Sequence, residues 1–216
     1  MTRFLIVRHA ESALNVQHRI QGHKDSGLTS KGFRQAERLA HKIKKIRIDK
    51  IYSSDLGRAY STTLEIARHT KLPIVQDPLL REIHLGEWEG KTPEEVNELY
   101  DQGYQKWLKK PSGIKIPKGE PLKQFKKRVT GRLRAIARSN RGKTVLVVTH
   151  GGVITALLSE WLKADFDNLL LHLQIDNTSL TVADETEKLV RLKIINDTSH
   201  LNETQKYELH GFSKRS

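Results

Sequence analysis

Two histidines and two arginines lie at or just beyond the ends of short apolar runs that are far apart in the sequence: Arg8, His9, Arg58 and His150. A neutral imidazole is a competent nucleophile toward phosphorus, and two guanidinium groups can bind phosphate oxygens in a bidentate manner. Arginines close to a histidine also disfavour its protonated form, which helps to keep the nucleophile neutral. These residue types therefore indicate phosphoryl chemistry, provided that the fold brings them together.

The glycine pair Gly151-Gly152 directly follows His150 and supports this interpretation. If the pair opens a helix, the free N–H groups and the positive end of the helix dipole would face the same anion. Taken singly, each residue has a structural explanation: a histidine at a strand end is commonly a satisfied polar residue, an arginine a surface group, and two glycines a tight turn. The interpretation depends on the four residues meeting at one edge of one sheet.

The elements that must position these residues alternate between short apolar runs and amphipathic segments. Strands are predicted at Phe4–Val7, Lys50–Ser53, Leu72–Gln76 and Thr144–Thr149, with a late hairpin over Thr178–Ala183 and Leu189–Ile195. Apolar spacings of three and four predict four helices. They cover residues 33–46, a stretch that follows the strand Lys50–Ser53 and runs to about Thr70, the segment from Leu122 to just before Asn140, and residues 151–162. This order favours a three-layer α/β fold with a mainly parallel central sheet and helices on both faces. In such sheets ligands bind beyond the carboxyl ends of the strands, where the four residues would meet.

One segment interrupts this alternation. Thr92-Pro93-Glu94-Glu95 has the pattern of a capping box with proline at the first helical position, so a helix is predicted to begin there. Three prolines and two glycines then predict a loop between Lys109 and Pro121. We therefore expect a single domain over residues 1–216 with a small helical cap insert at about 91–121. The last 20 residues are mostly polar and are expected to end the chain loosely.

Composition excludes several classes of protein. The 216 residues include no cysteine, which excludes a disulfide framework, a thiolate nucleophile and a cysteine-ligated metal site. No apolar run approaches the roughly 18 residues of a membrane-spanning helix. The chain starts Met-Thr-Arg and leads directly into a strand-sized run, which is too short for the core of a signal peptide. We expect a cytoplasmic protein without a membrane partner.

The net charge of +13 is concentrated in residues 101–143, which hold fourteen Lys or Arg and two acidic residues. Such a segment could bind nucleic acid, an acidic surface or an anionic substrate, or it could be a solvated face that serves solubility. Aromatic stacking platforms are few within it and no nucleic-acid motif is visible, so nucleic acid is not an expected partner.

Six segments resemble those of the histidine phosphatase superfamily, the phosphoglycerate-mutase-like fold, and they follow one another in family order. The first reads Leu-Ile-Val-Arg-His-Ala-Glu-Ser from Leu5, and the fifth reads Val-Val-Thr-His-Gly-Gly from Val147. Ala10 is a departure, since relatives commonly have glycine there, and we expect altered packing rather than lost activity. The resembling segments are 5–15, 28–36, 53–59, 80–90, 147–152 and 177–179.

The resemblance implies a phosphohistidine mechanism in which His9 attacks phosphorus in line. Arg8, Arg58 and His150 would neutralise the three non-bridging oxygens. Glu82 would protonate the leaving alkoxide and then deprotonate the incoming water. No metal or cofactor is required, because the cationic side chains supply the charge.

Other residues near these motifs receive weaker assignments. By the same resemblance, substrate-contacting positions fall at Asn15, Gln21 and Gly22, and Gly151 would add its helix-terminal N–H. The neighbouring Glu87 and Glu89 are expected to be surface carboxylates beside Trp88.

Three functions remain in view. The spacing between Glu82 and His150 is shorter than in cofactor-dependent mutases, which favours a metal-independent phosphatase that hydrolyses a small phosphorylated metabolite. Lysines of the presumed cap could face a second anionic group, which keeps a phosphoglycerate mutase open. A non-catalytic protein that binds anions or nucleic acid on the same scaffold is the alternative of another class. The natural substrate and the choice between monomer and dimer are left open.

Overall fold

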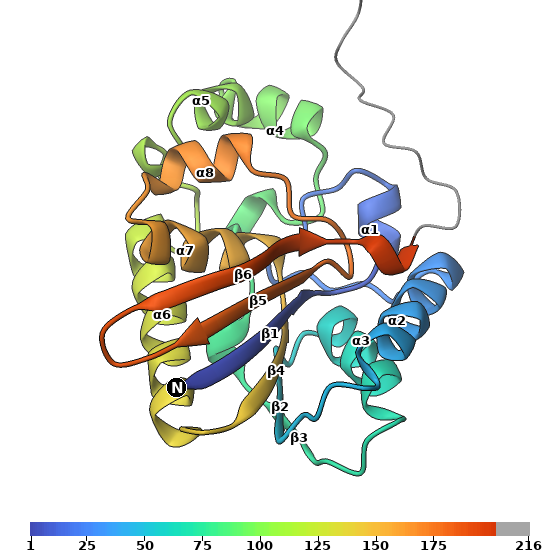
Figure 1. Ribbon diagram of the computed structural model, residues 1–216. Coiled ribbons are helices and arrows are strands. Elements are labelled where there is room, and N and C mark those ends of the chain that lie inside the picture. Colours follow the sequence, from blue (N-terminus) through green and yellow to red (C-terminus); the bar gives the residue numbers. More distant parts are fainter. Residues whose placement is uncertain (202–216) are drawn as a thin grey trace, which may run out of the picture.

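A six-stranded sheet forms the centre of the molecule in the computed structural model, which describes residues 1–201 (Figure 1). Its strand order is β3-β2-β4-β1-β5-β6. The first four strands in this order run parallel, and β5 and β6 are antiparallel additions at one edge. The mainly parallel sheet and the late hairpin are thus confirmed. The strands are β1 (Thr2–Arg8), β2 (Lys50–Ser53), β3 (Ile74–Gln76), β4 (Thr144–Thr149), β5 (Leu180–Glu185) and β6 (Val190–Asp197).

The pairing of β1 with β4 positions the site. Both strands are apolar on both faces, because each face is covered by helices. Their parallel register pairs Val7 with Val148 and Arg8 with Thr149, so the two strands end in step. The His9 N–H then donates to the Thr149 carbonyl at 2.8 Å. The residues that follow the two strands, His9 and His150, are consequently neighbours at the carboxyl edge of the sheet.

Helices cover both faces of the sheet, as predicted (Figure 1). One layer packs against alternate residues of β1 and β4 that include Leu5 and Val148, and the other packs against those that include Phe4 and Val147. The first layer holds α2 (Ser30–Ile43) and α3 (Gly57–Ala67); the second holds α6 (Leu122–Ser139), α7 (Gly151–Leu162) and α8 (Phe166–His172).

Several predicted boundaries were wrong. The helix expected over 33–46 ends at Ile43, and Ile46 is 38% exposed because it lies beyond the last turn that packs on the sheet. The third helix ends at Ala67 rather than near Thr70. Helix α8 was not predicted; it is two turns long and starts at Asp165, whose side chain accepts the Asn168 N–H.

The segment predicted to form a cap contains α4 (Pro93–Leu99) and α5 (Gly103–Lys109), which lie above α8 in Figure 1. The predicted capping box is present: the Thr92 hydroxyl accepts the Glu95 N–H, and the Glu95 carboxylate accepts the Thr92 N–H. Trp88, Val96 and Ile116 form a small separate apolar cluster beneath these helices. The predicted loop after Lys109 contains one 3₁₀ turn, η3 (Pro111–Gly113), tied to α8 by a hydrogen bond from the Ser112 N–H to Asp167.

The remaining short elements connect these layers. They are α1 (Ala13–Val16) and the 3₁₀ turns η1 (Pro78–Leu80), η2 (Gly86–Trp88) and η4 (Ser199–Leu201).

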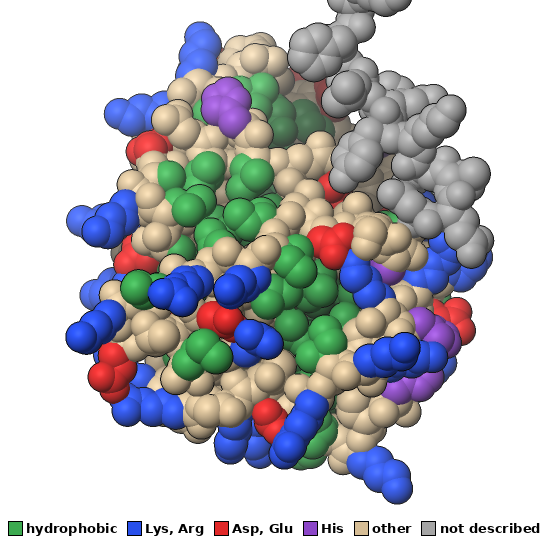
Figure 2. All heavy atoms as spheres, viewed as in Figure 1, with side chains coloured by type: hydrophobic (Ala, Val, Ile, Leu, Met, Phe, Trp, Pro, Cys, Tyr) green, Lys and Arg blue, Asp and Glu red, His purple; other side chains and the backbone are tan. Residues whose placement is uncertain are grey.

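No helix within residues 1–201 is long and apolar enough to span a bilayer. The polar tail was expected to end the chain loosely. Its residues 202–216 lie outside the described part of the chain. Figure 2 shows that on the face over β5 and β6 lysine and arginine side chains are dispersed among apolar and acidic ones, so the basic charge forms no continuous patch on this face.

Candidate active site

The four residues predicted to do chemistry meet at the carboxyl edge of the sheet. The His9 and His150 ring centroids are 5.2 Å apart. Arg58 lies in the first turn of α3, and its Nε is 3.3 Å from His9 Nε2. Arg8 Nε lies beside the start of α7, in ordinary contact distance of the position that a side chain at Gly151 would take. Three of these side chains are almost wholly buried, with 3%, 0% and 1% exposure for His9, His150 and Arg58.

The hydrogen bonds of His9 define its tautomer. Its Nδ1 lies 2.8 Å from the Ala10 carbonyl, which can only accept, so Nδ1 carries the proton. The lone pair is therefore on Nε2, where the Arg58 Nε–H donates to it. Burial, followed by the charges of Arg58 and Arg8, holds the pKa of His9 well below its ordinary value. The ring is thus neutral at pH 7, with its unprotonated nitrogen facing Arg58.

Ala10 provides its backbone to this arrangement. Its carbonyl accepts from His9, its N–H donates to the Thr62 hydroxyl at 2.9 Å, and its methyl group is fully buried. Both bonds are made by main-chain atoms that every residue type except proline supplies. The methyl group is accommodated in the core without displacing either bond; that activity is retained with alanine here stays a prediction.

His150 is held by a residue that sequence reasoning did not single out. Its Nε2 lies 2.8 Å from the Ser54 hydroxyl, which also accepts the Leu56 N–H at 3.3 Å. We infer that the hydroxyl donates to Nε2, so the proton of the neutral ring is on Nδ1. This Nδ1 and the Nε of Arg8 are buried and have no hydrogen-bond partner among the described residues. Burial, then Arg58 and His9, hold the pKa of His150 well below its ordinary value.

Arg58 is fixed by the loop that precedes α2. One terminal nitrogen donates to the Gly22 carbonyl at 2.7 Å, and the other donates to the Lys24 carbonyl at 3.0 Å and to Asp25 at 3.2 Å. Gly22 has a φ of +55°, in the region that favours glycine. Of the predicted substrate-contacting positions, Gly22 therefore also has a clear second role, which is to orient Arg58.

Glu82 lies against the start of α7. Its Oε2 accepts the Gly152 N–H at 3.0 Å, and its Oε1 accepts the Ile83 N–H at 2.9 Å. A Cβ atom at Gly152 would lie 2.3 Å from Glu82 Oε1, so the second glycine of the pair permits this approach. Gly151, the other member, begins α7 directly after His150. The helix start thus holds the acid that the family resemblance picked out.

Asn15 and Gln21 lie together at Ser12, on the segment that follows β1. The Ser12 hydroxyl is 3.0 Å from both Asn15 Oδ1 and Gln21 Oε1. Asn15 also accepts the Ser12 N–H at 3.0 Å, which caps α1. The oxygen atoms of both side chains are therefore used within the protein.

The expectation that Glu89 is a surface carboxylate was wrong. Its side chain is 12% exposed, and its two oxygens accept N–H groups of His23, Lys24 and Leu85 at 2.8 to 2.9 Å. The carboxylate thereby joins the loop that orients Arg58 to the segment that carries Glu82. Glu87 is 36% exposed and pairs with Lys118, as expected of a surface group. The sequence feature that could have indicated this buried role is the position of Glu89 between the tryptophan and the glycine of the Gly86–Gly90 motif.

Replacing Glu89 with alanine is expected to lower the free energy of unfolding by about 2–4 kcal/mol, because it removes a charged acceptor from three backbone donors. The matched variant Glu87→Ala removes an exposed ion pair, so it should change stability by less than about 1 kcal/mol. Urea unfolding of both variants at pH 7.5 measures the difference. Equal losses in the two variants would contradict the linking role of Glu89.

Arg128, one of the basic residues of α6, was also missed. Its guanidinium donates to the carbonyls of Leu79, Arg81 and Glu82 at 3.0 to 3.1 Å and pairs with Glu120. It therefore fixes the backbone of the segment that carries Glu82. Other basic residues of the segment are also paired internally: Arg132 with Asp77, and Lys126 and Arg134 with Glu160. Part of the positive charge of 101–143 thus serves the fold.

The two buried histidines predict a loss of stability in weak acid. In the unfolded chain each imidazole gains a proton as pH falls through about 6.5, whereas the folded state keeps His9 and His150 neutral. The unfolded state then binds more protons, so the free energy of unfolding should fall by about 1.4 kcal/mol per pH unit for each histidine. Urea unfolding between pH 7.5 and 5.5 measures this slope. His200, whose pKa is lowered to about 4, adds to the same slope. His150→Asn should therefore remove only the share of one histidine, about 1.4 kcal/mol per pH unit, whereas His41→Asn, at an exposed position of α2, should leave the slope unchanged.

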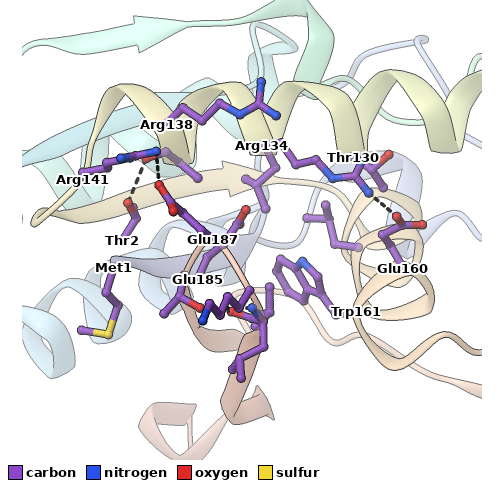
Figure 3. A pocket seen from close by; sticks show the side chains of 17 residues that line it. Met1, Thr2, Thr130, Arg134, Arg138, Arg141, Glu160, Trp161, Glu185 and Glu187 are labelled. Carbon is purple, nitrogen blue, oxygen red and sulfur yellow. Dashed lines mark hydrogen bonds and ion pairs between the residues drawn. The ribbon is translucent and has the colours of Figure 1, made fainter.

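A hollow of about 660 Å³ lies elsewhere, between α6, the end of α7 and the β5–β6 turn (Figure 3). Thr2 and Glu185, which line it, are register partners at the opposite end of β1 from His9. None of the predicted site residues lines this hollow in the described part of the chain. Within residues 1–201, no group of three or more His, Asp or Glu is arranged to hold a metal ion.

A mainly parallel α/β sheet whose carboxyl edge gathers two neutral histidines, two arginines and a carboxylate defines an enzyme of phosphoryl transfer. Comparison with known proteins identifies the family to which this enzyme belongs. The sequence profile of the histidine phosphatase superfamily (branch 1) matches residues 4–198. The chain belongs to this superfamily and is a phosphatase that acts through a phosphohistidine.

Several known proteins are similar in sequence to nearly the whole of this chain. Phosphoserine phosphatase 1 of Hydrogenobacter thermophilus is 34% identical over 94% of this chain and 96% of its own. The metal-independent phosphoserine phosphatase of Arabidopsis thaliana is 33% identical over 94% of this chain and 84% of its own. The solved structure of Bacillus stearothermophilus YhfR is 32% identical and has a TM-score of 0.89, over 94% of this chain and all of that one.

Proposed function

We propose that His9 is the nucleophile of this phosphatase and that Arg8, Arg58 and His150 hold the phosphoryl group during its transfer. The observation that carries the proposal is the set of buried N–H groups around His9. Arg58 Nε faces His9 Nε2, and the Nε of Arg8 and Nδ1 of His150 have no hydrogen-bond partner among the described residues. Buried donors are normally satisfied. Phosphate oxygens are acceptors that would satisfy the two donors without a partner, and Arg58 Nε, which donates to His9 Nε2 in the structure, would turn to them when Nε2 bonds to phosphorus.

In the first step, His9 Nε2 forms a bond to phosphorus while the bond from phosphorus to the ester oxygen breaks. Nδ1 keeps its proton and its bond to the Ala10 carbonyl, so the phosphorylated ring, which becomes cationic, has an acceptor to stabilise it. The arginines and His150 bind the equatorial oxygens, whose charge must be stabilised in the transition state. Glu82, in its protonated form, gives its proton to the leaving oxygen and becomes a carboxylate.

In the second step, water attacks the phosphohistidine. The Glu82 carboxylate takes a proton from this water as the new P–O bond forms and the P–N bond breaks. Inorganic phosphate is released, His9 returns to its neutral form, and Glu82 is protonated again for the next cycle. The chain's own cationic groups supply the charge stabilisation in both steps, so the proposed mechanism requires no metal ion.

The substrate proposed is a small phosphorylated metabolite that carries a carboxylate, with phosphoserine as the leading candidate. This rests on the relatives, of which two are named phosphoserine phosphatases and match nearly the whole chain. We propose that residues 91–121 act as a cap over the phosphate site and contribute to substrate selection. Val96 and Ile116 of this segment pack with Trp88 in a small apolar cluster apart from the two large ones, which supports this role.

The test is a paired assay in the presence of EDTA. Phosphate release is followed from a panel of phosphomonoesters that includes phosphoserine, and conversion of 3-phosphoglycerate to 2-phosphoglycerate is followed with added 2,3-bisphosphoglycerate. We expect phosphate release, highest with phosphoserine, and no isomerisation. Isomerisation would instead establish the mutase. Silence in both assays would contradict catalysis and favour the anion-binding protein; a binder of nucleic acid would then show affinity that falls steeply with salt.

A further inference from the structure

Thr178 has a backbone conformation that its residue type rarely adopts. Its φ is +56°, in the left-handed region, where a β-branched residue is a true outlier. Such a conformation costs free energy and persists only where surrounding contacts hold it, commonly near functional sites. The residue is fully buried. Something in the structure must therefore hold this turn in place.

The turn formed by Asn177 and Thr178 holds the backbone of the nucleophile. The Thr178 N–H donates to the carbonyls of Arg8 and His9 at 3.0 and 3.3 Å. The side-chain amide of Asn177 donates to the same His9 carbonyl at 2.9 Å. The turn thus binds the two carbonyls at the point where β1 ends and the site begins. A change in this turn would move the backbone that carries both Arg8 and His9.

His200 is the side chain that holds Thr178. The Thr178 hydroxyl donates to the Asn177 carbonyl at 2.7 Å, so its remaining contact, 3.0 Å from His200 Nε2, is one in which the imidazole N–H donates. This fixes the threonine side chain from one side and the tautomer of His200 from the other. His200 Nδ1 is buried and has no hydrogen-bond partner among the described residues.

His200 belongs to the 3₁₀ turn η4, which follows β6 and packs against α2 (Figure 1). Arg38 donates to the Leu201 carbonyl at 3.1 Å, and Lys42 bonds the Ser199 hydroxyl at 2.6 Å and pairs with Asp197. Burial, together with the charge of Lys42, lowers the pKa of His200 to about 4, against the opposing effect of Asp197. The ring is therefore neutral at pH 7 and keeps the N–H that Thr178 accepts.

We propose that His200 is a positioning residue for the phosphatase reaction, which holds the strained Thr178 turn and thereby the backbone of Arg8 and His9. This inference rests on the proposed role of His9 as nucleophile. The residue does not touch the reacting atoms; it acts through Thr178. Because in-line attack is sensitive to the placement of the nucleophile, loss of this contact reduces the rate of phosphoryl transfer more than it weakens substrate binding.

The first test compares two substitutions of His200. His200→Leu keeps similar bulk but removes the N–H donor, and it should lower kcat about tenfold or more while KM changes by less than about threefold. His200→Gln retains a donor near the position of Nε2 and should stay within about threefold of the unsubstituted protein in both constants. Rapid-quench measurement of phosphohistidine should locate the loss in its formation. Equal kcat for His200→Leu and the unsubstituted protein would overturn the proposal, as would equal losses for Leu and Gln.

A double-mutant cycle separates positioning from general stability. Thr178→Gly removes the hydroxyl and accepts a positive φ without strain, so adding His200→Leu to it should cause no further loss of kcat. If His200 acted only on stability, its substitution would cost the same in both backgrounds, which would refute the inference. Thr178→Ala keeps the strain without the hydroxyl and should lose activity as His200→Leu does. It therefore provides the test if Thr178→Gly folds poorly.

A spectroscopic readout keeps this inference distinguishable from the proposed function. Long-range ¹H–¹⁵N spectra of the histidine side chains report the environment of the His9 ring without turnover. We expect the His9 signals to shift in His200→Leu and to remain in place in His200→Gln. If the unsubstituted protein hydrolysed no monoester, the proposed function would fail. If it were active and both the His9 signals and kcat were unchanged in His200→Leu, the positioning role alone would fail.

Discussion

His9→Ala should lower kcat by about 10³-fold or more on every monoester, because no other group at the site can form the covalent intermediate. In the proposed mechanism the lone pair on Nε2 is the nucleophile, and the alanine variant leaves the proposed phosphate-binding donors of Arg8, Arg58 and His150 in place. Binding of inorganic phosphate or vanadate should therefore persist while turnover is lost. The measurements are steady-state hydrolysis and alkali-quenched trapping of labelled phosphoenzyme, which should be absent in the variant.

The matched control is His41→Ala, which removes an exposed histidine of α2 and should retain full activity and the same amount of phosphoenzyme. Thermal unfolding shows whether the His9 variant is folded, so that lost activity can be attributed to chemistry. A folded His9→Ala protein that still accumulated acid-labile phosphate on the chain would remove His9 from the nucleophilic role.

Glu82→Gln should produce a loss that depends on the leaving group. The amide cannot donate the proton that an alkoxide leaving group such as that of phosphoserine requires, so kcat/KM for phosphoserine should fall by about 10²–10⁴-fold. p-Nitrophenolate departs without protonation, so formation of the phosphoenzyme from p-nitrophenyl phosphate should fall by less than about tenfold. Burst kinetics with p-nitrophenyl phosphate isolate this first step from the later hydrolysis, in which Glu82 is also proposed to act.

Glu98→Gln, at an exposed position of α4, is the control and should leave both substrates unaffected. Glutamine at position 82 can accept only one of the two N–H groups, those of Gly152 and Ile83, that the carboxylate accepts, so thermal unfolding should be measured alongside the kinetics. A uniform loss on both substrates in the burst phase would point to disturbed geometry and would argue against proton donation by Glu82.

The basic segment illustrates how charge in a sequence can be distributed between fold and function. Its concentration of lysine and arginine left both an anion-binding surface and a solvated face open, whereas Arg128 and Arg132 form contacts inside the protein. Arg128 in particular ties α6 to the segment that carries Glu82. Substituting this residue therefore bears on catalysis through the backbone at residues 79–82, even though α6 itself supplies no residue to the proposed chemistry.

The central strands and the residues at their ends could be predicted from the amino-acid sequence. Apolar runs such as Thr144–Thr149 can be stable only between two covering layers, and a parallel sheet places the ends of such strands at one edge. His9 and His150 are adjacent to strand ends in the sequence, so their meeting follows from the sheet alone. The choice of Glu82 required the resemblance to a family, because nothing local distinguishes it from neighbouring glutamates.

The groups that orient these residues could be identified only from the folded structure. The tautomers of His9 and His150 depend on which acceptor or hydroxyl faces each ring nitrogen. Glu89 joins two loops whose residues are more than 60 positions apart, and His200 contacts Thr178 across a β-hairpin. These are contacts between short polar segments that carry no periodic pattern. Their partners are set by how loops return to the sheet edge, which local residue preferences do not specify.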